Sequence, residues 1–142
     1  MLNQQTRQRL KALSILMLGL ALSACSISVE RSSLSDGAKS YLVYAETHEP
    51  KTVFSVEDEK VTLHVRFEAN VVASTQRFRS VWYEPSGQTY VAGSISTIFG
   101  SNRDLIVSLQ LKDAPAAKKP GMWRVELYHG EKKLVVHEFE VR

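Results

Sequence analysis

The sequence predicts one all-β domain, an antiparallel β-sandwich of about seven or eight short strands, behind an N-terminal segment of different character. Two observations carry this prediction. Apolar and polar residues alternate with a period of two through most of the chain after Lys39, as they do in strands with one buried face. Turn-forming residues separate these runs, and no run has the period of 3.6 residues that an amphipathic helix requires.

Residues 1–24 are predicted to be a cleavable secretion signal. Met1–Lys11 contains three cations and no acid, and an apolar stretch follows from Ala12 to Leu22. A charged segment before an apolar stretch of this length is typical of secretory signals. The stretch is too short for a membrane-spanning helix, because a helix needs about 20 apolar residues to cross the bilayer.

The apolar stretch ends in Leu22-Ser23-Ala24-Cys25, which resembles the lipobox of bacterial lipoproteins. Small side chains at Ser23 and Ala24 admit the backbone to a protease site, and Leu22 fills an apolar pocket. The thiol of Cys25 is the group that forms a thioether with diacylglycerol. The resemblance implies that Cys25 is lipidated, that the signal is cleaved before it, and that its new amino group is acylated.

The same resemblance implies a location. Ser26, rather than Asp, follows Cys25, which favours export to the outer membrane of a Gram-negative cell with the domain facing the periplasm. In a Gram-positive cell the same signal would leave the protein on the outer face of the cytoplasmic membrane. Several acyl chains would anchor the protein more firmly than the weak, reversible binding of one chain.

The charge of the domain argues against nucleic acid as a partner. The whole chain has 18 Lys and Arg against 15 Asp and Glu, but three of the cations, Arg7, Arg9 and Lys11, lie in the signal. The remaining chain is formally neutral and lacks the basic cluster that binds a phosphate backbone. Cys25 is the only cysteine, which excludes an internal disulfide and a cysteine-based zinc site.

Residues 25–39 are expected to be the lipidated N-terminus and a flexible tether, and residues 40–142 the β-sandwich domain. Ser26–Lys39 contains five serines, one glycine and few large apolar residues. A flexible chain of this length reaches about 20 Å. The domain is therefore expected to reorient freely near the membrane surface.

The expected strands follow the alternation along the chain. The clearest is 61–69, where Val61, Leu63 and Val65 share one face with Phe67. Similar patterns predict strands at 105–111, 123–128 and 134–141, with weaker signals at 40–45, 77–83, 89–92 and 94–99. Glu84-Pro85-Ser86-Gly87 predicts a tight turn, and residues 129–133 are expected to close a terminal hairpin.

The last 60 residues resemble the final strands of immunoglobulin-like modules in bacterial envelope proteins. The resemblance rests on the order of three segments: 81–87 (VWYEPSG), 120–125 (PGMWRV), and then Gly130, Leu134 and 139–141 (FEV). It implies an immunoglobulin-like sandwich. The cysteine pair of antibody domains is absent, and a fold does not by itself define a function.

Three tyrosines are the candidate binding residues. The phase of the strand at 77–83 places Trp82 in the core and Tyr83 outside. Tyr83, Tyr90 and Tyr128 would form an aromatic surface for a glycan or a partner protein if they share one face.

No catalytic, metal or cofactor site is expected. The histidines, His48, His64, His129 and His137, are not spaced as a metal-binding pair on one strand or helix, and isolated surface positions explain them better. The acidic run at 57–59 lacks the ligand pattern of a calcium loop. No nucleophile motif of a hydrolase and no phosphate-binding loop occurs in the sequence.

These observations predict a non-catalytic, membrane-anchored module of the cell envelope. It would dock onto another envelope protein through an exposed edge strand or a cluster of loops. Two alternatives stay open: a periplasmic lipoprotein that binds a glycan, a lipid or a metal, and an envelope enzyme whose residues converge only in the folded chain.

Overall fold

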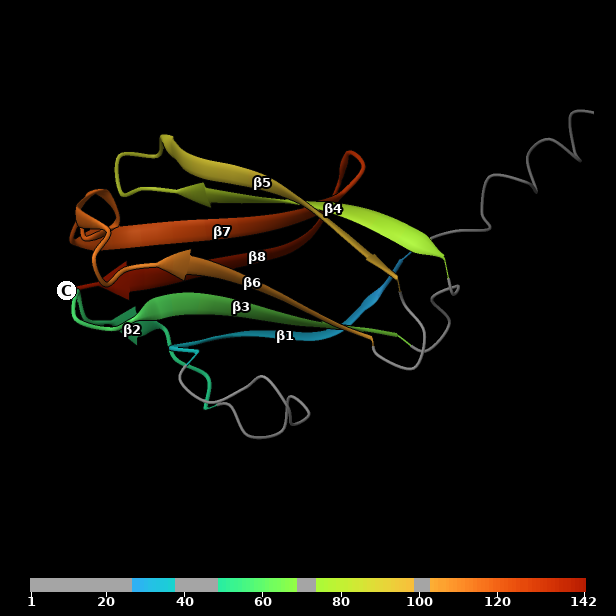
Figure 1. Cartoon of the computed structure of the whole chain (residues 1–142), viewed down its shortest axis with the longest axis horizontal. Coiled ribbons are helices and arrows are strands. Elements are labelled where there is room, and N and C mark those ends of the chain that lie inside the picture. Colours follow the sequence, from blue (N-terminus) through green and yellow to red (C-terminus); the bar gives the residue numbers. More distant parts are fainter. Residues whose placement is uncertain (1–26, 38–48, 69–73, 99–102) are drawn as a thin grey trace, which may run out of the picture.

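The computed structural model of the protein describes residues 27–37, 49–68, 74–98 and 103–142, which form two β-sheets packed face to face (Figure 1). The smaller sheet has the strand order β1-β3-β6, with β1 (Val29–Ser35), β3 (Lys60–Phe67) and β6 (Asp104–Gln110). The larger sheet has the order β2-β8-β7-β4-β5, with β2 (Val53–Phe54), β4 (Thr75–Tyr83), β5 (Thr89–Ile98), β7 (Gly121–His129) and β8 (Lys132–Val141). The predicted β-sandwich is confirmed.

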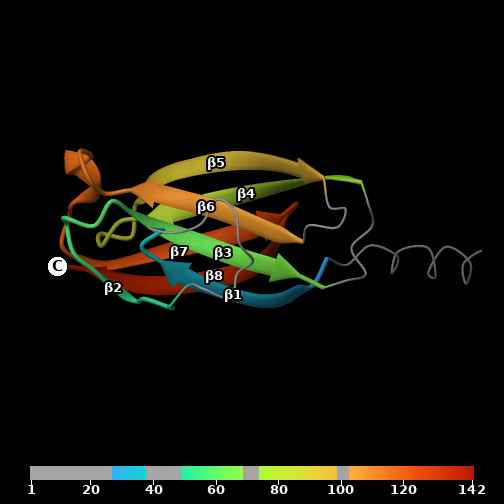
Figure 2. The same cartoon turned by 60° about the horizontal axis from the view of Figure 1, so that its bottom comes forward.

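The described ranges contain no α-helix and one short 3₁₀ helix, η2 (Pro115–Ala117), between β6 and β7. Accordingly, none of these ranges contains a helix that is long and apolar enough to span a bilayer. All strand pairs are antiparallel except β2 with β8, which run parallel. The second view shows the three-stranded sheet crossing in front of the five-stranded one (Figure 2).

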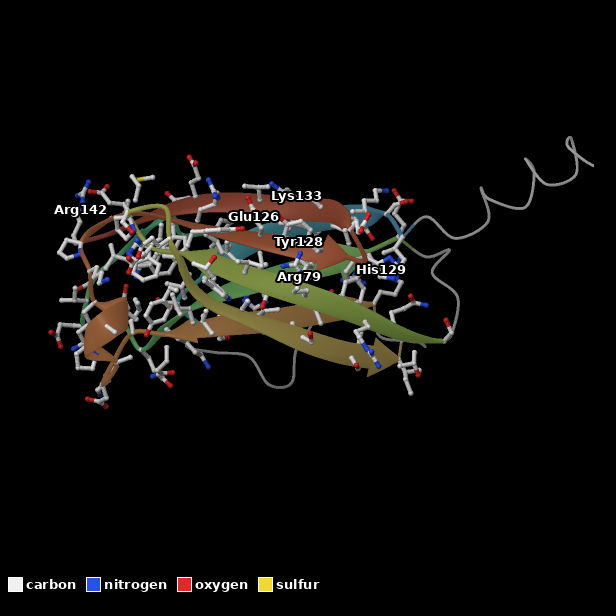
Figure 3. All side chains as sticks on the ribbon, turned by 90° about the horizontal axis from the view of Figure 1, so that it is seen from above. Arg79, Glu126, Tyr128, His129, Lys133 and Arg142 are labelled. Carbon is white, nitrogen blue, oxygen red and sulfur yellow. The ribbon has the colours of Figure 1, made fainter. Side chains whose placement is uncertain are left out.

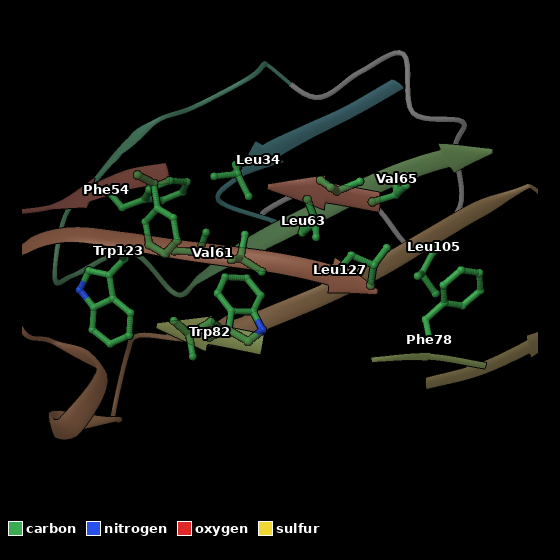
Figure 4. Packing of buried hydrophobic residues seen from close by; sticks show 14 of the residues in the cluster. Leu34, Phe54, Val61, Leu63, Val65, Phe78, Trp82, Leu105, Trp123 and Leu127 are labelled. Carbon is green, nitrogen blue, oxygen red and sulfur yellow. The ribbon is translucent and has the colours of Figure 1, made fainter. Parts of the chain in front are cut away.

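The core lies between the sheets and is built from the faces that the alternation predicts (Figure 4). On β3, Val61, Leu63, Val65 and Phe67 are almost fully buried. The larger sheet faces them with aromatic rings. The Trp82 ring packs edge-on against Phe139 at 6.1 Å between centroids, and the Trp123 ring stacks on Phe139 at 6.3 Å. Trp82 is thus a core residue, as its phase in the sequence predicts.

One expected element is wrong, because residues 29–35 of the predicted tether form strand β1. This strand pairs with β3 in an antiparallel register that includes Leu34 opposite Leu63. Leu34 is buried, and Ser35 donates or accepts a hydrogen bond with His64 at 2.8 Å. The serines hide this strand in the sequence, since they make it look like a solvated segment although its backbone pairs with β3 from Arg31 to Ser35.

Other differences concern the limits of strands. Instead of two strands at 89–92 and 94–99, β5 runs without a break from Thr89 to Ile98, because Gly93 stays extended and pairs with Ser80. β2, a strand of two residues, was not predicted. The strand expected at 40–45 lies outside the described residues.

Both predicted turns are present. The Gly87 N–H donates to the Glu84 carbonyl at 2.8 Å, and Gly87 has a φ of +84°, which favours glycine. At the terminal hairpin, β7 ends at His129 and β8 begins at Lys132, so the loop has two residues. Gly130 in this loop has a φ of +58°, as tight hairpins require.

Candidate functional site

The residues predicted to direct lipidation, Leu22, Ser23, Ala24 and Cys25, lie outside the described residues. Lipidation of Cys25 therefore stays a prediction from the sequence. The other candidates, Tyr83, Tyr90 and Tyr128, all lie on described strands of the larger sheet.

The sheet brings together two of the three tyrosines. Tyr83 on β4 and Tyr128 on β7 point to the outer face, and both hydroxyls donate to the carboxylate of Glu126. Tyr90 points the other way, because a β-bulge between Trp82 and Tyr83 shifts the register of β5. Its ring packs against Trp123 at 5.4 Å between centroids. The expected surface of three tyrosines does not form.

Glu126 is the centre of this outer face, and it is only 4% exposed. One carboxylate oxygen accepts from the Tyr83 hydroxyl at 3.2 Å and from Tyr128. The other accepts from the Lys133 Nζ at 3.0 Å and lies 3.2 Å from the Arg124 Nε. Figure 3 shows Glu126 between Tyr128 and Lys133 on the outer surface. Charge and hydrogen bonds thus compensate for burying the carboxylate.

The two tyrosine rings are each covered by an arginine. The guanidinium carbon of Arg124 lies 4.3 Å from the centroid of the Tyr83 ring, and that of Arg79 lies 4.5 Å from the Tyr128 ring. Stacking of this kind leaves the donor groups of an arginine directed to its surroundings. The outer face is therefore a layer of cations over aromatic rings rather than a bare aromatic surface.

The pKa values of this cluster follow from its contacts. Burial raises the pKa of Glu126, but the hydrogen bonds from Tyr128 and Lys133 outweigh burial and leave the pKa below its usual value. The hydrogen bond to Glu126 raises the pKa of Tyr128 and also that of Lys133. At neutral pH the carboxylate stays ionised, and the cluster has a fixed pattern of charge.

Arg79, Arg124, Glu126 and Lys133 were not among the residues predicted to form a site. Alternation alone places Arg79 on the outer face with Tyr83, and Glu126 on the outer face with Tyr128. What the sequence leaves open is the register, in which Arg79 pairs with Tyr128 and Tyr83 with Arg124. Knowledge of that register would have revealed the cluster.

The described histidines do not gather. His64 was expected on a solvated face, but it is 8% exposed and bonded to Ser35. His129 bonds to Gln76 at 3.0 Å, and His137 bonds to Ser32 at 2.8 Å. Within the described ranges, no group of three or more His, Cys, Asp or Glu side chains has the geometry of a metal site. His48 lies outside those ranges.

Strand β5 is the second feature of interest, because it forms an open edge of the larger sheet. It has ten residues, and in the described part of the chain it pairs only with β4. Its sequence, TYVAGSISTI, contains no charged residue and no proline. Natural edge strands are usually protected by charges, proline, bulges or short length, and here only the bulge at its first residues provides such protection.

The other edges of the two sheets are protected. β2 has two residues and covers β8 only at Glu140 and Val141, so the rest of β8 is also an edge, and it carries Lys132, Lys133 and Glu138. β1 contains Glu30 and Arg31 with a register shift between Val29 and Arg31, and β6 begins with Asp104. β5 is therefore the long, uncharged edge of this sandwich. Val91 and Ile98 on β5 are 43% and 69% exposed.

Comparisons with known proteins place the fold and nothing beyond it. No family model matches the chain, and no curated protein matches its sequence. An immunoglobulin-like protein from Pseudomonas aeruginosa is similar in structure, with a TM-score of 0.59 and 11% identity over 84% of this chain and 98% of that one. The immunoglobulin-like fold expected from the sequence is thereby confirmed.

A second solved structure is similar over a part of its length. It is an alkylpurine DNA glycosylase from Pseudomonas fluorescens, bound to DNA containing an abasic site analogue. The match has a TM-score of 0.53 and 16% identity, and it covers 87% of this chain but 32% of the glycosylase chain. At such identity the match indicates a shared fold only, since one fold serves many functions.

Proposed function

We propose that this protein is a lipid-anchored, non-catalytic binding module of the bacterial cell envelope. It holds a partner protein by accepting an extended segment of that partner along β5. The observation that carries the proposal is the ten-residue, uncharged, open edge of β5. Such an edge offers unpaired backbone N–H and C=O groups to an added strand, which is a common way of recognising peptides.

The side chains around β5 favour a partner segment with acidic residues. Arg77 and Arg79 on β4 are exposed on the outer face, and the register places Ser96 and Ser94 of β5 beside them. Cross-strand neighbours of this kind have Cβ atoms about 5 Å apart. An added strand would lie about 4.8 Å beyond β5, so its outward carboxylates would come within reach of Arg77, whereas Arg79 lies over the Tyr128 ring of β7.

The anchor and the lack of catalysis are parts of the same proposal. The sequence Leu22-Ser23-Ala24-Cys25 supports attachment to a membrane. The Glu126 cluster supports a structural and binding role, because four neighbours hold its carboxylate ionised and occupy both of its oxygens. The arginines over Tyr83 and Tyr128 make stacking of a glycan on these rings the weaker alternative.

The test is site-specific photocrosslinking in intact cells with the full-length protein. A photoreactive residue at Ser94 on β5 is expected to form a covalent adduct with one envelope protein, whereas the same residue at Val136, exposed on β8 at the other side of the larger sheet, is not. Ala92→Lys places a charge on the open edge and should abolish the adduct. Val136→Lys, which adds the same charge away from β5, should leave it unchanged.

The outcomes separate the proposal from its alternatives. Equal adducts from Ser94 and Val136, or an adduct that survives Ala92→Lys, would exclude docking at β5. An adduct of twice the mass of the chain would replace the partner by a second copy of this protein. Cys25→Ala is expected to release the protein from the membrane fraction, and retention there would contradict the lipid anchor.

A further inference from the structure

The core of the domain includes a residue two positions after the proposed lipid attachment site. Ile27 is 6% exposed and belongs to the core, and the Ser28 carbonyl accepts a hydrogen bond from the Glu68 N–H at 3.0 Å. Two residues extend by at most about 7 Å. In the sequence only Ser26 separates Cys25 from Ile27. The chain between the proposed attachment site and the core is therefore much shorter than the flexible tether expected from the sequence.

This connection selects one end of the sandwich, which we call the entry end. Here β1 begins beside the end of β3, as Val29 pairs with Phe67. The ring of Phe67 packs against Phe78 of β4 at 5.1 Å between centroids, and Phe78 packs against His129 at the end of β7. Both sheets therefore contribute to the entry end, and the two views place the start of β1 and the start of β4 there (Figures 1 and 2).

The entry end is basic. Its described residues contain seven cations and five acids. The cations are Arg31, Arg66, Arg77, Arg79, Arg103, Lys132 and Lys133, and the acids are Glu30, Glu68, Asp104, Glu126 and Glu131. The opposite end has eight acids and six cations. The acids are Asp36, Glu49, Glu57, Asp58, Glu59, Glu84, Asp113 and Glu140, and the cations are Lys51, Lys60, Lys112, Lys118, Lys119 and Arg142. The domain is neutral as a whole, but its charge is divided along its length.

Several of these cations are available to an external anion. Arg31, Arg77 and Lys132 are exposed, and none of them forms an ion pair with another residue of the described ranges. Ile98, the last residue of β5, lies at the same end opposite Thr75 and is 69% exposed. An exposed aliphatic side chain among free cations is the chemistry of a protein surface that contacts a lipid bilayer.

We infer that the entry end lies against the membrane surface, where its free cations contact anionic lipid headgroups and Ile98 enters the interface. This inference rests on the proposed lipid anchor at Cys25. It follows that the domain is oriented, with the long axis of its strands rising from the membrane and the acidic end directed away. A juxtamembrane cation contributes about a fivefold preference for the docked orientation.

The experiment uses the mature, lipidated protein extracted from membranes and reconstituted on vesicles. The thiol of Cys25 is bound in the thioether, so Ile98→Cys supplies the free thiol for a polarity-sensitive fluorophore. Met122→Cys, 56% exposed near the opposite end, is the matched control. On phosphatidylglycerol-containing vesicles we expect a blue shift and quenching by brominated lipids at position 98 and neither at position 122.

Charge removal completes the test. A variant in which Arg31, Arg77 and Lys132 are all replaced by Gln should lower the ratio of docked to undocked label about a hundredfold. Circular dichroism checks that the variant is folded. Similar signals at positions 98 and 122, or equal signals on anionic and on neutral phosphatidylcholine vesicles, would overturn the orientation.

Failure of the anchor is distinguishable from failure of the orientation. A chain that lacks the acyl mass and does not float with vesicles would contradict the proposed lipid anchor, and the inference would fall with it. A chain that has the acyl mass and floats, but shows no contact at position 98, would contradict the orientation alone.

Discussion

Ser32 and His137 join the two sheets of the sandwich through a hydrogen bond of 2.8 Å between the serine hydroxyl and the histidine Nε2. Ser32 belongs to β1 in the smaller sheet, and His137 to β8 in the larger one. The bond spans 105 residues of sequence. It also holds β1 against the larger sheet, although the serine-rich composition of β1 is typical of a solvated tether.

This relationship predicts how stability depends on pH. Burial lowers the pKa of His137 below 6.5, so folding favours the neutral ring. A group whose folded pKa is lowered in this way binds more protons when unfolded. The stability is present above pH 6.5 and is lost as the pH falls from 6.5 through the folded pKa, at up to about 1.4 kcal/mol per pH unit.

The measurement is chemical denaturation between pH 7.5 and pH 5 for the wild type and for His137→Asn. The variant should lose part of the pH dependence of its stability. His129→Asn is the control, because the His129 ring lies at the terminal hairpin and is bonded to Gln76 of β4. Identical slopes in the wild type and in His137→Asn would contradict the assignment of the pH effect to this histidine.

The buried carboxylate of Glu126 predicts a specific cost for its loss. Glu126→Gln removes the charge that Lys133 and the two tyrosines satisfy, and we expect the free energy of unfolding to fall by about 1–3 kcal/mol. The pKa of Tyr128 should also fall toward its ordinary value, since its hydrogen bond to Glu126 raises it. Spectrophotometric titration of the tyrosines measures that change.

Glu138→Gln is the matched control for this prediction. This substitution removes the same charge from the outer face of β8, where Glu138 is exposed opposite Arg124. A surface substitution of this type changes stability by about 0.5 kcal/mol or less. If both variants were equally stable, the carboxylate of Glu126 would not hold the outer face together.

The start of β7 predicts a position where only glycine is tolerated. Gly121 has a φ of +129°, and a Cβ added there would lie 3.0 Å from two side-chain carbons of Pro85. Gly121→Ala should therefore lower the free energy of unfolding by about 1–3 kcal/mol. Gly93→Ala is the control, because Gly93 has open space around it and no positive φ. If Gly121→Ala and Gly93→Ala were equally stable, the backbone at Gly121 and the side chain of Pro85 would adjust to the added Cβ without loss of stability.

The integration of β1 into the sandwich predicts that the serine-rich segment is essential for folding. Leu34 is 2% exposed, so Leu34→Ala should cost about 2–5 kcal/mol. Ser33→Ala changes the neighbouring residue, whose side chain points to the other face, and should have little effect on thermal unfolding. A small effect of Leu34→Ala would restore the view of this segment as a dispensable tether.

The sequence predicts the fold class well because apolar side chains recur at every second position of strands such as β3 and β7. Val61, Leu63 and Val65 identify the inner face of β3, and the same reasoning assigns Trp82 to the core and Tyr83 to the outside. Turn chemistry at Gly87 and Gly130 is also local, since a positive φ favours glycine wherever it occurs. These features depend on neighbouring residues only, and the structure confirms them.

The candidate site was only partly predictable. Tyr128 was expected on the surface, but its partners Arg79, Glu126 and Lys133 depend on the register of three strands. The single extra residue in the β-bulge near Tyr83 is enough to turn Tyr90 to the inner face. A period of two makes side-chain direction sensitive to one residue, so a bulge that no local pattern announces can reverse it.

The sequence by itself determined that this chain is an all-β sandwich behind a segment resembling a lipoprotein signal, because strand periodicity and signal composition are properties of contiguous residues. Only the tertiary structure decided that the serine-rich segment is a strand, that Glu126 collects its partners from neighbouring strands, and that β5 is the open edge. The physical reason is that pairing, register and edge position are set by contacts between residues far apart in the chain, whose energies no local pattern contains.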